Sequence, residues 1–550
     1  MLINKINRYR EIFTILAKYG LADWLARLNL EFARGVLEKG LGENMIAYSH
    51  SHRVRMAFTE LGPTFIKLGQ ILSTRPDLIG LELSDELKHL QSNVPSDPPD
   101  VVQKIVETEL GKPLGELFET FDLKALASAS IGQVHIARLK TGEEVVVKVQ
   151  HLGIEDKIQQ DLDILLDLAE LLEKHVEESR NYRPIQTSDE FKRLLLKELD
   201  FLREKRNLEQ FTVNFARSKN VHIPKVYNGY CTSRVLTMEK LNGIKISERE
   251  KLIAAGYNLS QLAVLGATTF LRMIFEHGFY HADPHPGNII IMEGQKIGLI
   301  DCGMVGRLDD DLREDIEDIL MSIVNQNSKK LLNIITRLGS TPRNLDRMLL
   351  NHDISEFVHY YSSLPLQDLK LNKAMQEMTS IIRRHGILLP SSISLLIKVL
   401  VMLEGTSHSL TTDFDLISVM KPYQKKMVLN RLSPARQKRM LQNFYQDIER
   451  LMHVVPMGLM AIIENLQRGD LTIKLDYYRL ENAVNRVAFG MITSAIFLGS
   501  SLLMSFNVKP MIWEVSFPGL VGYIVSFIFG IKLLWSIYTS GNLYDRQKNP

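Results

Sequence analysis

The amino-acid sequence predicts an α+β protein built from a helical N-terminal arm, a strand-rich lobe, a helical lobe and a C-terminal pair of membrane-spanning helices. Residues 133–150, QVHIARLKTGEEVVVKVQ, alternate as β-strands do, with Thr141-Gly142 as the turn between two strands. From about residue 255 to 480 the pattern is helical, apart from short apolar strands near 289–301. Two charge-poor runs near the end of the chain are long enough to cross a bilayer.

The composition is that of a globular protein with more than one domain. Of the 550 residues, 45% are hydrophobic and 24% charged, which excludes collagen-like and disordered classes. With 66 Lys and Arg against 64 Asp and Glu, the net charge is only +2, so we expect no nucleic-acid partner. The two cysteines, Cys231 and Cys302, exclude a disulfide scaffold and a cysteine-rich zinc site, and they fit a reducing compartment.

The N-terminal segment predicts an amphipathic helix. Leu2–Leu28 mixes charged and apolar residues and has no uninterrupted apolar region, so it is not a signal peptide. Its apolar stripe is imperfect and includes Ile12, Leu16 and Trp24. Two alternatives follow, packing on the body of the protein or lying on a membrane surface, and the pattern favours packing.

The two C-terminal runs predict a transmembrane hairpin. Val487–Val508 holds no charged residue, and Phe517–Tyr538 holds only Lys532. At ~1.5 Å per residue each helix would measure roughly 33 Å, enough for a hydrocarbon core of ~30 Å. The alternative, a pair of buried core helices, is disfavoured by the length and spacing of the runs.

Charges around the hairpin predict its orientation. Arg486 precedes it, and Arg546 and Lys548 follow it, so the positive-inside rule places both ends in the cytoplasm. Trp513 and Trp535 fall near the expected interfaces, which indole rings prefer.

A basic stretch precedes the hairpin. Residues 421–439 hold no acid. They form either a solvated helix face or a surface attracted to anionic lipid headgroups, which the nearby membrane anchor would support. The cations are Lys421, Lys425, Lys426, Arg431, Arg436, Lys438 and Arg439.

The strongest chemical signal is HADPHPGN at 281–288, followed by GLIDCG at 298–303. Phosphoryl transfer needs an acid near the nucleophile and oxygen ligands for Mg²⁺. Protein kinases supply them with H-x-D-x-x-x-x-N and a later D-F-G, a spacing that Asp283, Asn288 and Asp301 reproduce. Each residue alone is more often a cap or turn residue, but the joint pattern indicates a catalytic acid at Asp283 and metal ligands at Asn288 and Asp301.

A kinase-like site also needs a lysine on a strand and a glutamate partner on a helix. Lys148 in EVVVKVQ matches the strand lysine that contacts the α- and β-phosphates. The helical segment ELDFLREKRN offers Glu198, Asp200 and Glu204 as its partner, and helical periodicity does not choose among them. A Gly-rich loop is missing; ALASASIGQVH at 125–135 stands in its place and should be stiffer, because alanine resists positive φ.

Taken together, these motifs resemble the UbiB group of atypical kinases, also called AarF or ADCK proteins. Residues 50–420 carry the resemblance, through a K-x-G-Q motif at 67–70, an Ala-rich loop at 127–130 and E-x-D at 198–200. The C-terminal hairpin resembles that of bacterial members. The resemblance implies a protein-kinase-like two-lobed fold and a role in ubiquinone or related isoprenoid-quinone biosynthesis.

The resemblance also implies roles for single residues. Lys148 should pair with Glu204, while Lys67 and Gln70 should lie across the nucleotide site, with Lys67 facing Glu198 or Asp200. The arm that carries Lys67 would then keep protein substrates out of the cleft. The residues implied to contact the nucleotide are Ala127, Ser128, Ala129, Ser130, Lys148, Met238, Glu239, Lys67 and Gln70, with the hinge for adenine at Thr237–Lys240.

Two positions depart from the family pattern. Ser128 interrupts the alanine run, which bears on nucleotide preference. Cys302 replaces the phenylalanine of D-F-G, which weakens any inference about a phenylalanine-driven switch. We expect a buried, inert thiol there, with an oxidisable one as the alternative.

The resulting hypothesis is a membrane-anchored atypical kinase or ATPase that binds ATP or ADP with Mg²⁺. Its expected partners are membrane lipids, including anionic ones, isoprenoid or polyprenyl-phenol intermediates, and quinone-biosynthesis enzymes. Its expected place is the bacterial cytoplasmic (inner) membrane, as a multi-pass protein with its catalytic body in the cytoplasm. The alternatives are a nucleotide-binding, non-catalytic scaffold and a kinase acting on a small molecule or a protein.

The expected parts of the chain are an N-terminal helical extension (1–115), N-lobe (116–242), helical C-lobe (243–420), basic linker (421–486) and hairpin with tail (487–550).

Overall fold

The fold is described from a computed structural model that divides into two compact units, residues 1–433 and 434–550. The predictions for residues 22–28 of the N-terminal helix, 432–439 of the basic stretch, Trp513, Arg546 and Lys548 lie outside the described residues. Apart from a few isolated positions, the described ranges are 2–21, 48–90, 94–176, 183–342, 344–364, 370–411, 414–431, 480–506, 508–512 and 515–539.

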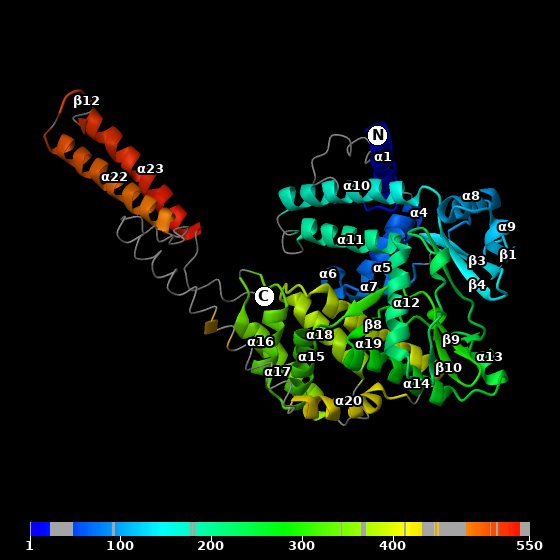
Figure 1. The fold of residues 1–550 in the computed structure, drawn as a ribbon. Coiled ribbons are helices and arrows are strands. Elements are labelled where there is room, and N and C mark those ends of the chain that lie inside the picture. Colours follow the sequence, from blue (N-terminus) through cyan, green and yellow to red (C-terminus); the bar gives the residue numbers. More distant parts are fainter. Residues whose placement is uncertain are drawn as a thin grey trace. The chain divides into compact units, whose positions relative to one another are not determined.

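The N-terminal arm is a set of helices within the first unit. Helix α1 (Leu2–Lys18) buries Ile12 and Leu16 in a cluster that it shares with α4 (His50–Leu61) and α10 (Ile154–His175). In the structure these residues therefore pack on the body of the protein, the first of the two alternatives given for this helix. The arm continues through α5 (Pro63–Leu72), α6 (Pro76–Ile79) and α7 (Leu81–Leu87) (Figure 1).

Helix α5 approaches its neighbours closely at Gly69 of the K-x-G-Q motif. A Cβ at this position would overlap the side chain of Leu90 and lie 3.0 Å from Phe58 Cδ2 on α4. The glycine therefore lets α5 dock against the rest of the arm, with Lys67 and Gln70 on the same helix.

The N-lobe is an antiparallel sheet of order β1-β3-β4-β6, with the short β2 paired to β3. The predicted hairpin is present, with Gly142 at φ +94° in its turn. In EVVVKVQ, Val145, Val147 and Val149 are fully buried in a cluster with α8. Because side chains alternate along a strand, Lys148 faces the opposite side of the sheet. The elements are α8 (Pro99–Leu110), α9 (Leu114–Leu117), β1 (Phe118–Phe121), β2 (Ala127–Ser128), β3 (Gly132–Leu139), β4 (Glu144–Gln150) and β6 (Val235–Glu239).

Two helices join the arm to the cleft. Helix α11 (Pro184–Leu199) ends with Glu198 and Leu199, and α12 (Phe201–Phe215) begins at once. Asp200 is the N-cap between them, since its carboxylate accepts from the Leu202 amide at 3.1 Å. The E-x-D motif is therefore a sharp turn between two helices. Glu198 and Glu204 consequently project from helices whose axes differ.

The C-lobe is helical around a small sheet that carries the chemical motifs. Strand β8 pairs with β11, and a second sheet has the order β5-β10-β9-β7. The first elements are β5 (Val221–His222), β7 (Ile244–Lys245), α13 (Arg249–Ala254), α14 (Leu259–Arg272), η4 (Met273–His277), β8 (Phe279–His281), η5 (Pro286–Asn288), β9 (Ile289–Met292), β10 (Lys296–Leu299) and β11 (Val305–Arg307). The short helix η3 (Asn228–Tyr230) belongs to the N-lobe, where Tyr230 packs on the sheet.

Helices complete the lobe, and one of them is apolar enough to be mistaken for a membrane span. These helices are α15 (Asp310–Val324), α16 (Ser328–Leu338), α17 (Arg347–Ser363), α18 (Leu371–Arg384), α19 (Ser391–Leu410) and α20 (Leu416–Arg431). Helix α19 is long and apolar enough to cross a membrane, yet 56% of its apolar 18-residue segment is buried inside the unit. The first unit reaches Ser433, so the first residues of the expected basic linker belong to α20, where Tyr423 donates to the Thr268 carbonyl.

The second unit contains a helical hairpin, α22 (Leu480–Ser505) and α23 (Phe517–Thr539), with β12 (Met511–Ile512) and β13 (Val515–Ser516) at its tip. Gly522 permits close packing, because a Cβ there would overlap the Ser500 hydroxyl. The outer faces expose large apolar side chains such as Leu498 and Phe527. Residues 488–505 and 517–534 are long and apolar enough to cross a membrane, and 6% and 11% of them are buried.

The first prediction concerns the buried ion pair that fastens α1 to α10. Arg8 donates from Nε to Asp161 Oδ1 at 2.7 Å, and Asp161 is fully buried. Arg8→Met leaves that carboxylate without its cation and should lower the free energy of unfolding by about 3 kcal/mol. The control Lys18→Met breaks the exposed pair with Glu60 and should cost less than about 1 kcal/mol. Urea denaturation in detergent checks both values, and equal losses would contradict the role of this pair.

Candidate active site

The centre of the candidate site is an ion cluster between the lobes. Lys148 Nζ on β4 lies 2.7 Å from Glu204 Oε2 on α12 and 3.3 Å from Asp301 Oδ1, just after β10. Glu204 is 4% exposed and Lys148 18%, whereas Asp301 keeps 58% of its side chain open. Of the three acids that the sequence left open, Glu204 is thus the partner of Lys148.

Asp301 is held in an unusual backbone conformation. Its φ is +56°, a region that non-glycine residues rarely adopt and that is common at functional sites. The next residue, Cys302, is fully buried, and its carbonyl accepts from Asn207 Nδ2 of α12 at 3.0 Å. Sequence reasoning missed Asn207, whose signal was an amide on the same helix as the predicted glutamate. Burial raises the pKa of the Cys302 thiol, as expected of the inert thiol rather than the oxidisable one.

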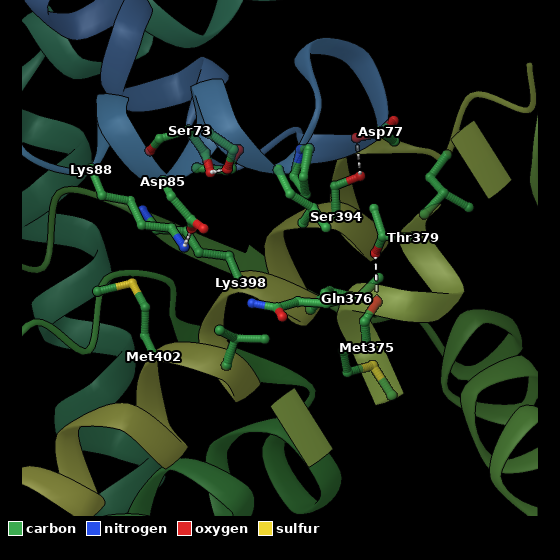
Figure 2. A pocket seen from close by; sticks show the side chains of 17 residues that line it. Ser73, Asp77, Asp85, Lys88, Met375, Gln376, Thr379, Ser394, Lys398 and Met402 are labelled. Atoms are coloured by element: carbon green, nitrogen blue, oxygen red, sulfur yellow. Dashed lines mark hydrogen bonds and ion pairs between the residues drawn. The ribbon is translucent and has the colours of Figure 1, made fainter. Parts of the chain in front are cut away.

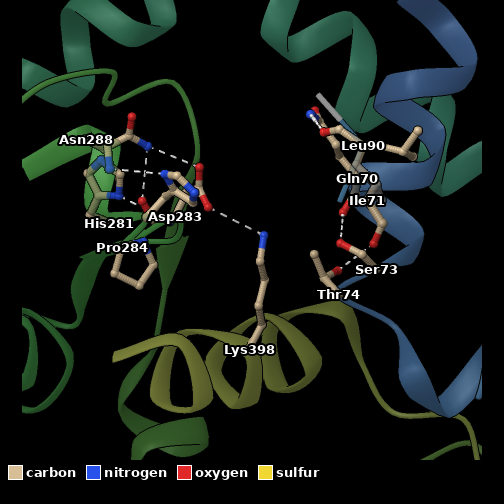
Figure 3. Close-up of polar contacts among 12 residues, drawn as sticks. Gln70, Ile71, Ser73, Thr74, Leu90, His281, Asp283, Pro284, Asn288 and Lys398 are labelled. Carbon is tan, nitrogen blue, oxygen red and sulfur yellow. Dashed lines mark hydrogen bonds and ion pairs between the residues drawn. The ribbon is translucent and has the colours of Figure 1, made fainter. Parts of the chain in front are cut away.

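The motif HADPHPGN, at the position of a kinase catalytic loop, lies across the cleft from Lys148. Strand β8 pairs Tyr280 and His281 with β11, which follows Asp301, so the two motifs are joined by a ladder. Asn288 Nδ2 donates to Asp283 Oδ2 at 3.1 Å and to the Asp283 carbonyl at 3.2 Å. The Asp283 amide donates to His281 Nδ1 at 3.1 Å (Figure 3). These contacts fix the Asp283 carboxylate, which is 36% exposed.

The arm crosses the cleft through Lys67. Its Nζ lies 2.6 Å from Glu198 Oε2. Asp200 does not meet it, because that carboxylate caps α12 and lies 3.3 Å from Arg206. Gln70 Nε2 donates to the Leu90 carbonyl at 3.3 Å, within the arm.

The charged groups of the cluster shift one another's pKa values. The Lys148 ammonium, with Lys67 behind it, outweighs burial and lowers the pKa of Asp301. Burial opposes the charge of Lys148, but Asp301 and Glu204 outweigh it and raise its pKa; for Lys67 too, Glu198 outweighs burial. Burial raises the pKa of Glu204. The raised pKa values favour the charged form of both lysines, and the lowered pKa of Asp301 favours its anion.

The Ala-rich loop is anchored from outside the cleft. His151 Nε2 lies 3.0 Å from the Ala129 carbonyl and 3.4 Å from Ser128 Oγ. Its Nδ1 lies 3.2 Å from Asp97 Oδ2. Sequence reasoning found neither Asp97 nor His151, since Asp97 sits in a Pro-rich break. Of the predicted loop residues, Ser130 is 3% exposed and so offers little surface to a ligand.

The strand predicted as the hinge for adenine, Thr237–Lys240, already makes contacts with other parts of the protein. The Glu239 amide donates to the Lys225 carbonyl at 2.8 Å, and its carboxylate lies 2.9 Å from His222 Nε2. Met238 is 6% exposed. Adenine recognition at this strand would therefore depend on groups other than the Glu239 amide and side chain.

A further lysine reaches the site from the C-lobe. Lys398 on α19 points its Nζ to within 3.7 Å of Asp283 Oδ1 (Figure 3). It also lines a cavity with about 530 Å³ of empty space, open mouth included, between the arm and helices α18 and α19 (Figure 2). The arm side includes Ser73, Asp77, Asp85 and Lys88, and the lobe side includes Gln376, Thr379 and Ser394.

The donor set fits Mg²⁺ shared with a phosphate. Asn288 uses its amide nitrogen on Asp283, which leaves its Oδ1 as a ligand atom, and Asp301 is open to the cleft. No group of three His, Cys, Asp or Glu that could hold a metal occurs among the described residues. Mg²⁺ is commonly held by one or two protein oxygens together with phosphates and water, so two donors suffice for such an ion.

Comparison with protein families gives three matches along the chain. Residues 89–335 match the ABC1 atypical kinase-like domain, and residues 354–415 match the UbiB helical domain. Residues 476–539 match the ABC1/UbiB kinase-like C-terminal domain. The matches include the cleft, the helical lobe and the C-terminal helices.

Individual proteins are similar over most of their length. An "uncharacterized protein in hydrogenase 1 5'region" of Clostridium pasteurianum is 31% identical over 98% of this chain and 100% of its own. A "probable protein kinase UbiB" of Pseudomonas paraeruginosa is 33% identical over 79% of each chain. The solved complex of Rv3197 with erythromycin from Mycobacterium tuberculosis is 22% identical, covers 64% of this chain and 89% of its own, and gives a TM-score of 0.45.

The second prediction tests the support of Asp301. Asn207→Leu removes the hydrogen bond to the Cys302 carbonyl and frees the strained backbone at Asp301. We expect the affinity for a fluorescent ATP analogue with Mg²⁺ to fall about tenfold, since a buried hydrogen bond contributes about 1 kcal/mol and its carbonyl is left unsatisfied. The control Gln210→Leu, on the exposed face of the same helix, should bind as wild type does. Equal affinities of the two variants would contradict the prediction.

Proposed function

Because this chain belongs to the ABC1/UbiB family of atypical kinase-like proteins, we propose that it binds a magnesium nucleotide and hydrolyses or transfers its terminal phosphoryl group at a membrane surface. The observation that carries the proposal is the convergence of Lys148, Glu204 and Asp301 within 3.3 Å contacts, with Asp283 and Asn288 across the same cleft. Inert surface pairs would not need a 4% exposed glutamate or a strained aspartate.

Each residue has a task in this proposal. Lys148, fixed by Glu204, binds and orients phosphate oxygens, and the stiff Ala-rich loop covers them. Asn288 and Asp301 hold Mg²⁺, which when bound offsets charge on the phosphates. Asp283 accepts the proton of the attacking hydroxyl or water.

The acceptor is proposed to be a small molecule. Lys67 and Glu198 tie the arm over the cleft, which leaves little room for a polypeptide segment. By family resemblance we propose support of ubiquinone or related isoprenoid-quinone biosynthesis, with polyprenyl-phenol intermediates and enzymes of that synthesis as partners. The exposed apolar helices α22 and α23 fit membrane association, and we propose the cytoplasmic membrane, with anionic lipids near the basic stretch.

One observation favours a second candidate, a nucleotide-binding scaffold that does not turn over. Lys148 and Lys67 are both engaged by carboxylates of the chain itself, so the phosphate site is closed by internal ion pairs. A scaffold would bind nucleotide in competition with these pairs and hold partner enzymes without transferring the phosphoryl group.

The third prediction separates these candidates. The full chain in detergent or on anionic liposomes should hydrolyse ATP in a Mg²⁺-dependent way, and Asp301→Asn should lower kcat about 100-fold or more, because it removes a carboxylate aimed at the metal. Asp415→Asn, far along the chain near α20, serves as the control and should leave kcat unchanged. Background rates in wild type, with nucleotide binding intact, would favour the scaffold.

The fourth prediction concerns the membrane. In a flotation assay with liposomes the full chain should rise with the lipid, because each helix of the hairpin exposes an apolar surface along its length. A chain that ends at Ser433 should stay at the bottom. Flotation of both would place membrane binding in the first unit instead.

A further inference from the structure

Lys398 is a largely buried cation that the kinase-like pattern does not require. It lies in the apolar helix α19, its side chain is 12% exposed, and its ammonium lies 3.7 Å from Asp283 Oδ1. A lysine is rarely buried to this degree without a purpose for its charge.

Lys398 and Asn288 both approach the Asp283 carboxylate. Asn288 donates to Oδ2 at 3.1 Å, and Lys398 faces Oδ1 at 3.7 Å from the opposite side (Figure 3). One oxygen thus accepts a hydrogen bond from the catalytic loop itself, and the other faces an ammonium on a helix that the catalytic-loop sequence does not include.

The groups around Lys398 shift the pKa of its ammonium in opposite directions. Burial lowers the pKa of Lys398, the positive charge of Lys67 lowers it further, and Asp283 and Glu198 oppose this. These groups come from the arm, α11 and the catalytic loop. Within the part of the chain that the structure describes, Asp283 provides the largest opposing interaction.

We propose that Lys398 is a positioning residue that orients the Asp283 carboxylate for proton acceptance, an inference that rests on the proposed function. As the acceptor oxygen forms its bond to phosphorus and the bond to the leaving nucleoside diphosphate breaks, the acceptor proton passes to Asp283. Lys398 keeps its own proton throughout and fixes which carboxylate oxygen faces the acceptor.

Steady-state kinetics of the full chain test the proposal. Lys398→Met should lower kcat about 10- to 100-fold, the range expected when a catalytic group is misplaced, with KM for ATP changed by less than about threefold because Lys148 is untouched. Lys398→Arg should recover most of kcat. The control Lys88→Met, which lies along the same cavity but pairs with Asp85 at 2.5 Å, should match wild type.

The pH profile distinguishes positioning from mere structure. The lowered pKa of Lys398 means that it loses its charge earlier on the alkaline side than an ordinary lysine, so kcat of wild type should fall there. Arginine stays charged, so Lys398→Arg should move that fall to higher pH. An unchanged alkaline limb, or kcat of Lys398→Met equal to that of Lys88→Met, would overturn the proposal.

Thermal unfolding gives a readout that does not depend on turnover. Asp283→Asn leaves Lys398 without its anion and should lower Tm by about 2 °C or more, and adding Lys398→Met should restore part of the loss. Additive shifts would overturn the pairing. If wild type shows no turnover but the shifts are non-additive, the proposed function fails while the Lys398–Asp283 contact stands.

Discussion

The contact between Lys148 and the two carboxylates of Glu204 and Asp301 is the constraint on which the rest of the first unit depends. The three residues come from the N-lobe sheet, helix α12 and the end of β10, so forming the contact fixes how these elements meet. The valines of β4 pack on α8 and turn Lys148 to the other face of the sheet. The Asp200 cap starts α12 where Glu204 falls in its first turn. Asn207, one turn later, holds the backbone that follows Asp301.

A second set of charges lies across the same cleft. Lys67 and Glu198 join the arm to α11, and the close approach at Gly69 lets α5 dock within the arm. Lys398 and Asn288 hold Asp283 from two sides. The site therefore combines three lysines with four carboxylates, each drawn from a different segment. Among the described residues the lysines are already paired with these carboxylates, so a phosphate must compete with the carboxylates for the lysines.

The pattern of residues predicted the local elements well. The alternation at 133–150 gave the hairpin, and the apolar runs at 487–508 and 517–538 gave two long apolar helices with exposed faces. Helical periodicity could not choose among Glu198, Asp200 and Glu204, because the choice depends on the break between α11 and α12; only the family resemblance pointed to Glu204, which the structure pairs with Lys148. Helical periodicity assumed one continuous helix, whereas the cap at Asp200 gives the two glutamates different axes.

Other parts of the site were beyond the sequence for a physical reason. Lys398 lies on α19, which folds back on the catalytic loop from far along the chain, and only tertiary packing brings them together. The one local signal is a lone lysine in the apolar run SISLLIKVLVML. His151 and Asp97 hold the Ala-rich loop by contacts of the same non-local kind.

We propose that one charge network, centred on Lys148, binds the nucleotide through both a cation and a metal. The decisive experiment is isothermal titration of ATP into the full chain, with and without Mg²⁺, repeated with Asp301→Asn. We expect Mg²⁺ to strengthen ATP binding to wild type, and the variant to lose this gain while it still binds ATP through Lys148. Equal strengthening by Mg²⁺ in both proteins would contradict it.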